Sequence, residues 1–151
     1  MPEERLIKAA EISVFAHATE DEDKVKQAVK RLAKYDPTFE SQRLTGHYED
    51  PINLLTSKTA QKREATDFLA NIINKLSSLD RETLLNELPN RVDPQGRLYI
   101  RLDKQKAYHG RAALNETDPI RVRFKFQLPH KADPVAVIRE CIINLEDDGE
   151  T

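Results

Sequence analysis

Two short stretches of the sequence place basic and aromatic residues at every second position, a spacing that could bind nucleic acid. The alternating residues are Arg97, Tyr99 and Arg101 in the first stretch and Arg121, Arg123 and Lys125 in the second. Period-two spacing puts each set on one face of a β-strand. Arginine and lysine contact phosphates, and unpaired bases stack on aromatic rings or guanidinium planes. The pattern fits equally well the solvated face of an antiparallel sheet, whose cations pair with acids on neighbouring strands.

The charge distribution along the chain singles out the same region. The net charge of the 151 residues is −2, yet residues 91–131 contain ten basic and four acidic side chains. The remainder of the chain is therefore acidic. Lys104 and Tyr108 follow the first stretch and fall inside this basic region. Lys104 is therefore a further candidate phosphate contact, and either Tyr99 or Tyr108 is expected to stack on a base.

The other residues with chemical potential form no recognisable catalytic or metal-binding motif. The four histidines, His17, His47, His109 and His130, are neither paired at the short spacing of a metal-binding helix nor set in a zinc signature. Glu20–Asp23 is typical of a helix start, and Cys141 lies on an apolar helix face. We therefore expect no catalytic residue, no metal site and no cofactor. A hydrolytic enzyme that uses His17 or His47 with nearby acids is the least favoured alternative.

Period-two and helical spacings then predict the elements that position these residues. Strands are expected at residues 7–18, 39–44, 52–57, 97–102 and 120–128, and helices at residues 20–34, 65–76, 84–88 and 134–145 with a helical turn at 103–110. Thr19, with Glu22 three residues later, predicts a capping box for the first helix. Asp133 before Pro134 predicts the N-cap of the last one. Residues 46–51 are expected to form a loop.

The order of these elements predicts an α+β fold. The 97–102 and 120–128 strands leave no room for a helical crossover, so we expect them to be adjacent and antiparallel. The fold class is thus a single domain with a mixed, largely antiparallel sheet and helices on one face. The buried positions should include Val14, Leu69, Ile72, Ile100, Val122, Phe124 and Ile142.

Length and composition set the broader class of protein. A chain of 151 residues is expected to form one domain, here residues 1–146, followed by a frayed acidic tail at residues 147–151. No apolar run approaches the roughly 18 residues of a membrane helix, and the N-terminus lacks the pattern of a signal peptide. We therefore expect a cytoplasmic protein with no membrane association.

Three stretches together resemble one known family. They are Val14–Asp21, the Gly46-His47-Tyr48 motif with Pro51-Ile52, and Arg97–Gln105 with Ala107, Tyr108 and Gly110. The combination resembles the archaeal family of predicted RNA-binding proteins, also described as predicted exosome subunits. In that family the second motif often has Gly-Asn before the proline, whereas this chain has Glu49-Asp50, which weakens a phosphate-binding role for the loop.

The resemblance implies a fold similar to the large-subunit ribosomal protein that binds 5S rRNA, and it brings no established catalytic residues. We therefore expect a non-catalytic RNA-binding module of archaeal RNA-processing or ribosome-related machinery, with RNA-processing proteins and a homodimer as further partners. The expected RNA contacts are Arg97, Tyr99, Arg101, Lys104, Tyr108, Arg121, Arg123 and Lys125. The alternative is a protein–protein adaptor or homo-oligomer that uses the same sheet face.

Overall fold

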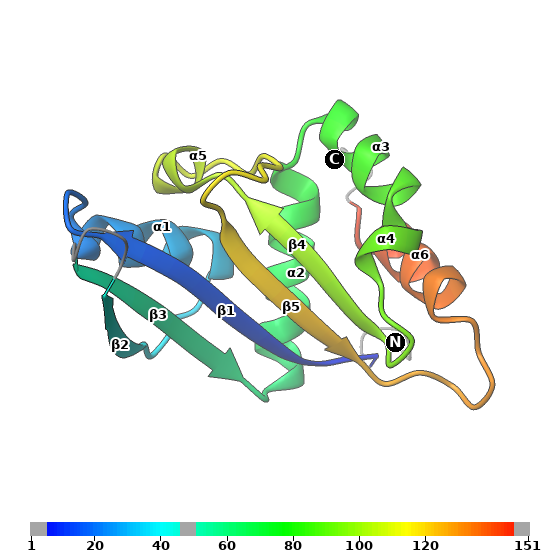
Figure 1. Cartoon of the computed structure of the whole chain (residues 1–151). Helices are drawn as coiled ribbons and strands as arrows, with labels where there is room; N and C mark the ends of the chain where they lie inside the picture. Colours follow the sequence, from blue (N-terminus) through cyan, green and yellow to red (C-terminus); the bar gives the residue numbers. More distant parts are fainter. Residues whose placement is uncertain (1–5, 46–50, 147–151) are drawn as a thin grey trace.

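Strand β1 (Ile7–His17) lies at the centre of a five-stranded sheet (Figure 1). The computed structural model describes residues 6–45 and 51–146. Its strands are arranged in the order β2 (Glu40–Thr45), β3 (Pro51–Thr59), β1, β5 (Ile120–Phe126) and β4 (Arg97–Leu102). Every neighbouring pair is antiparallel. The sheet is thus wholly antiparallel over the described residues, in agreement with the predicted largely antiparallel sheet and without the parallel pairing that a mixed sheet would contain.

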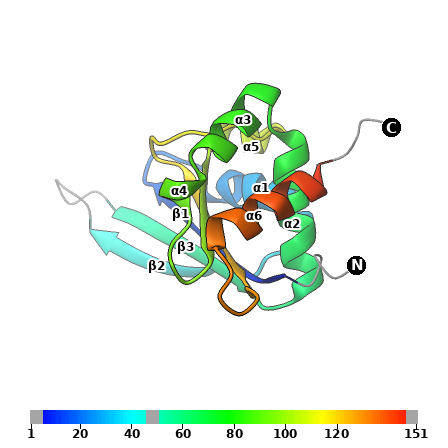
Figure 2. The same cartoon turned by 90° about the vertical axis from the view of Figure 1, so that its right-hand side faces the viewer.

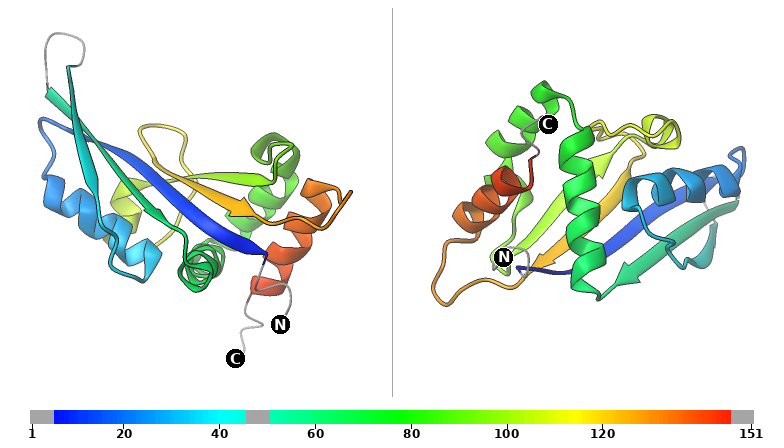
Figure 3. Two further views of the ribbon diagram at one scale, coloured as in Figure 1. Left: turned by 90° about the horizontal axis from the view of Figure 1, so that it is seen from below. Right: turned by 180° about the vertical axis from the view of Figure 1, so that it is seen from behind.

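The helices gather on one side of this sheet. Their bounds are α1 (Glu22–Ala33), α2 (Lys62–Lys75), α3 (Ser78–Asn86), α4 (Leu88–Arg91), α5 (Lys104–Tyr108) and α6 (Pro134–Leu145). Helices α1 and α2 pack against one face of the sheet, and α6 packs against α2 beside the β4 edge (Figures 2 and 3). Figure 1 looks onto the opposite face, which the described helices leave uncovered. This arrangement confirms the predicted α+β fold with helices on one face.

Alternate strand residues form the core beneath those helices. In β5 the buried side chains of Val122 and Phe124 alternate with more exposed basic ones. The ring of Phe124 meets the ring of Phe68, from α2, edge to face at 5.3 Å. All seven positions predicted to be buried are at most 1 % exposed. The period-two interpretation of these strands is therefore confirmed.

Strands β4 and β5 are adjacent and antiparallel, as predicted, with Ile100 opposite Val122. Several boundaries differ by a few residues: β1 ends at His17 and β5 ends at Phe126. The 39–44 and 52–57 strands are found as β2 and β3. Asp133 lies at the N-cap position of α6 as expected, but its side chain makes no capping hydrogen bond. Residues 46–50 of the predicted 46–51 loop and the tail at residues 147–151 lie outside the described residues, and Pro51 begins β3 instead of ending the loop.

The predicted cap of the first helix is wrong. Thr19 lies in a turn, and Asp21 caps α1 by accepting a hydrogen bond from the backbone N–H of Asp23. Two hydrogen bonds between Glu20 and His17 close this turn. The backbone N–H of Glu20 donates to the carbonyl of His17 at 2.9 Å, and the backbone N–H of His17 donates to the carboxylate of Glu20. Residues 18–20 are therefore used in the turn, and the helix begins at Glu22.

Among the described helices, none has the length and apolar character needed to span a membrane.

Candidate nucleic-acid interface

The uncovered side of the sheet brings the two basic stretches together. In the antiparallel register Tyr99 lies opposite Arg123, and Arg101 lies opposite Arg121. We call this surface the open sheet face. It comprises Arg97, Tyr99 and Arg101 of β4, Arg121, Arg123 and Lys125 of β5, and Glu11 and Ser13 of β1. Six of the eight sequence-predicted contact residues thus lie on one surface.

Three of these cations form ion pairs with acids. The guanidinium of Arg123 pairs with the carboxylate of Glu11 on the neighbouring strand. Arg101 lies 3.2 Å from Glu116, and Arg97 lies 3.5 Å from Asp93. The cross-strand pairing that the sequence left open as an alternative therefore exists for part of the surface.

Two cations of the open sheet face have no such acid. Arg121 and Lys125 are exposed, and within residues 6–45 and 51–146 neither forms an ion pair with a carboxylate. The Arg121 guanidinium lies over the ring of Phe15, 5.5 Å from its centroid, a contact that attracts the cation but brings no negative charge. Exposed cations without a local counterion attract phosphates most strongly, because binding costs no existing ion pair.

Tyr99 is held in place by the turn that precedes its strand. Its hydroxyl donates to the carboxylate of Asp93 at 3.1 Å. Burial raises the pKa of Asp93, but hydrogen bonds from the Arg97 backbone N–H and from Tyr99 outweigh that effect, so the pKa lies below its ordinary value. Asp93 is therefore ionised at neutral pH. The Tyr99 ring is thereby fixed among the surrounding cations.

Lys104 has different surroundings from the other predicted contacts. Its side chain is 13 % exposed, and its ammonium donates to the carboxylates of Glu20 at 3.0 Å and Asp118 at 2.8 Å. A third bond, at 2.7 Å, goes to the backbone carbonyl of Phe15. This lysine joins the ends of three segments, and its charge is already balanced by two acids.

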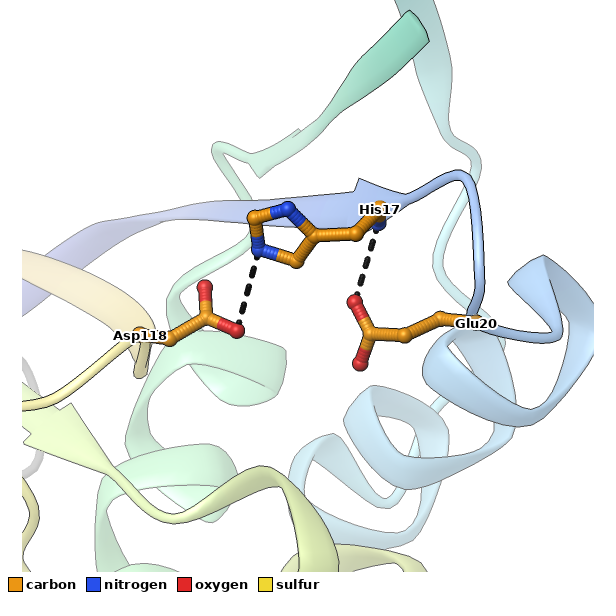
Figure 4. Close-up of side chains that lie close together, drawn as sticks. All are labelled: His17, Glu20 and Asp118. Atoms are coloured by element: carbon orange, nitrogen blue, oxygen red, sulfur yellow. Dashed lines mark hydrogen bonds and ion pairs between the residues drawn. The ribbon is translucent and has the colours of Figure 1, made fainter. Parts of the chain in front are cut away.

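The same acids surround His17 at the end of β1 (Figure 4). The Nε2 atom of His17 lies 3.1 Å from Asp118, and its backbone N–H donates to Glu20 at 2.9 Å. Burial by itself raises the pKa of Asp118. Hydrogen bonds from Lys104 and His17 lower it by a larger amount, so the pKa lies below its ordinary value. His17, Glu20 and Asp118 each offer one potential ligand atom, and these three atoms lie within 4.8 Å of one another. The Lys104 ammonium competes with any cation for both carboxylates.

Tyr108 lies away from the open sheet face. It belongs to α5, where Lys24 and Arg31 of α1 lie 5.8 and 5.9 Å from its ring centroid. The two tyrosines that the sequence offered as stacking residues are therefore in separate places. Tyr99 is the one that the structure brings together with the basic strands.

Sequence reasoning missed two residues of the open sheet face. Glu11 lies opposite Arg123, and Ser13 lies opposite Arg121. Both alternate with buried residues of β1, a signal that placed them on the outer side of their strand. The sequence did not show that β5 is the neighbour of β1, so their proximity to the cations could not be seen.

An open sheet with exposed cations and an aromatic residue, backed by helices, defines an α+β protein suited to binding nucleic acid. The chain belongs to the family whose sequence model is described as RNA binding, which matches residues 9–126. It is similar to the RNA-binding protein PAB1135 of Pyrococcus abyssi, with 36% identity over 139 residues, 87% of this chain and 90% of that protein.

Two crystallised or otherwise solved archaeal proteins have the same fold. AF2318 from Archaeglobus fulgidus superimposes with a TM-score of 0.77 and 30% identity, over 89% of this chain and 99% of that one. Mth689 from Methanothermobacter thermautotrophicus gives a TM-score of 0.72 and 25% identity, over 93% and 98% of the two chains. Both are described as DUF54 proteins. The family resemblance indicated by the sequence motifs is therefore confirmed.

Proposed function

We propose that the open sheet face binds RNA, and that the protein acts as a non-catalytic RNA-binding module. One observation carries this proposal. Arg121 and Lys125 are exposed, form no ion pair with a carboxylate among the described residues, and lie on the same uncovered surface as Tyr99. Membership of the RNA-binding family supports it. A place in RNA-processing or ribosome-related machinery, including the exosome, is proposed on the family resemblance alone.

The distribution of charge favours local binding. The net charge of the whole chain is −2, so phosphates are attracted only where cations outnumber acids. Arg121 and Lys125 supply two such contacts. Arg101 adds a third, since it is 45 % exposed and shares its partner Glu116 with Arg91. The proposed RNA contacts do not include Lys104 and Tyr108, which the sequence predicted. Lys104 is paired with Glu20 and Asp118, and the ring of Tyr108 contacts Arg31.

The experiment that tests this function is a salt titration of RNA binding by fluorescence anisotropy. The probe is a labelled 12-nucleotide single-stranded RNA of mixed sequence, at 50 to 200 mM KCl. The Arg121→Ala/Lys125→Ala double variant should bind more weakly to every sequence. The slope of log K against log salt should shrink by about one to two units, since each lost phosphate contact accounts for roughly 0.7–0.9.

A matched control carries the same change of charge elsewhere. Lys62 and Arg63 are exposed on α2, on the covered side of the sheet. The Lys62→Ala/Arg63→Ala variant should leave the slope unchanged. Equal losses in the two double variants would contradict a defined binding face. A folded wild-type protein that binds no RNA at 50 mM salt would favour the adaptor or homo-oligomer, and a mass above that of one chain in sedimentation would then favour the homo-oligomer.

A further inference from the structure

The open sheet face contains a hollow that phosphate binding does not explain. Its volume is about 190 Å³, and it lies over β1, β5 and β4. Its floor includes Ile100 and Val122. The polar and aromatic residues around it are Glu11, Ser13, Tyr99, Arg101, Arg121 and Arg123. The hollow therefore combines an aromatic ring, three guanidinium groups and one carboxylate.

The carboxylate of Glu11 is the informative group. A carboxylate beside the hollow gains nothing from phosphate binding, because like charges repel. Glu11 already accepts from Arg123 and lies 3.3 Å from the ammonium of Lys58. An ionised carboxylate offers about four acceptor sites, so roughly two remain for a ligand. N–H donors of a ligand can therefore bond to Glu11, while its acceptors bond to the surrounding guanidinium groups.

We infer that the hollow takes one unpaired guanine base, an inference that rests on the proposed RNA-binding function. Guanine presents adjacent N1–H and N2–H donors on its Watson–Crick edge, which match a carboxylate. It presents O6 and N7 acceptors on its other edge, which match a guanidinium. Arg121 has no carboxylate partner among the described residues and is free to donate there. Adenine, cytosine and uracil each place an acceptor beside their Watson–Crick donor.

The same geometry selects single-stranded RNA or a loop. In a duplex the Watson–Crick edge of guanine is occupied, so Glu11 could not reach its N–H groups. Tyr99 lines the hollow and provides an aromatic surface on which an unpaired base can stack. The flanking phosphates would then lie near Arg101 of β4 and Lys125 of β5, two cations of the open sheet face.

The test compares three 12-nucleotide RNAs that differ at one base. Each is oligouridine with a central guanine, inosine or adenine, and the dissociation constant is measured by anisotropy. Wild-type protein should prefer guanine over adenine by about tenfold or more, the range of one good bidentate pair. Inosine should be intermediate, because it lacks the N2 amino group but keeps N1–H, O6 and N7.

Two variants assign the preference to the carboxylate. Glu11→Gln should reduce the guanine-to-adenine ratio to about one while the salt slope remains. Lys58→Ala removes a partner of Glu11 but keeps the carboxylate, so the ratio should remain. Thermal melts of both variants check that they are folded, and the three-base comparison on wild-type protein stands without any variant.

The outcomes separate this inference from the proposed function. Equal binding of all three RNAs by wild type, with a reduced salt slope in Arg121→Ala/Lys125→Ala, would overturn the guanine site and leave RNA binding intact. A guanine preference that persists in Glu11→Gln would also overturn it. No binding of any RNA at low salt would defeat both proposals.

Discussion

Replacing Lys104 with methionine tests whether this residue is structural. Methionine keeps most of the apolar stem but removes the ammonium that binds Glu20, Asp118 and the carbonyl of Phe15. The two carboxylates then lose their shared cation and repel each other. The backbone carbonyl loses a charge-assisted hydrogen bond.

The expected loss of stability follows from exposure. Removing one partner of a buried ion pair costs ~3–5 kcal/mol. Here the side chains of Glu20 and Asp118 are 31 % and 38 % exposed, so water can solvate them again and reduces that cost. We expect the free energy of unfolding to fall by about 2–3 kcal/mol. For a domain of this size the melting temperature should then drop by roughly 4–12 °C.

Urea denaturation followed by circular dichroism at pH 7 measures this loss. The matched control is Lys125→Met, which removes an exposed ammonium that has no ion pair in the described part of the chain. Its stability should stay within about 0.5 kcal/mol of wild type. RNA affinity should behave in the opposite way, falling in Lys125→Met and holding in Lys104→Met. A Lys104→Met protein as stable as wild type, with weakened RNA binding, would refute the structural role.

Three further predictions concern stability. Asp21→Ala should lower the free energy of unfolding by about 1 kcal/mol because it removes the cap of α1, whereas Thr19→Ala should leave urea denaturation unchanged. The pKa of Asp118 is lower in the folded than in the unfolded state, so ionised Asp118 stabilises the fold. This stabilisation is fully present above the pKa of the unfolded state, near 4, and is lost as the pH falls through the pKa of the folded state. Asp118→Asn should therefore be less stable at pH 7 and approach wild type in acid titrations, and a constant difference across pH would contradict this. Gly96→Ala should cost about 1–2 kcal/mol, because φ is +85° and the new Cβ would lie 2.8 Å from Leu128, and an unchanged melting temperature would show that the turn relaxes.

The sequence predicted those parts of the fold that depend on local periodicity. Alternation in residues 97–102 and 120–128 was enough to assign which side chains are buried, because each strand face repeats every two residues. The short connection between the two stretches then determined that they pair. Thr19 was assigned wrongly because its capping pattern competes with a turn, and the hydrogen bonds of Glu20 to His17 decide that competition.

The partners of individual charges could not be predicted in the same way. Lys104 meets Glu20 across 84 positions of sequence, and this contact depends on where α5 is packed. Glu11 meets Arg123 only because β1 and β5 are neighbours. The cations of the open sheet face were thus visible in the sequence, whereas the position of the Glu11 carboxylate beside them and the hollow could be seen only in the fold.

The central claim is that the open sheet face binds RNA. The most direct test is an NMR titration that follows the Nε–Hε signals of the arginine side chains in ¹⁵N-labelled protein. During titration with single-stranded RNA, we expect the signals of Arg101, Arg121 and Arg123 to shift. Those of Arg81 and Arg139, which lie on α3 and α6 and bind Glu146 and the carbonyl of Leu85, should stay in place. Shifts confined to Arg81 and Arg139, at RNA concentrations that saturate binding, would contradict the account.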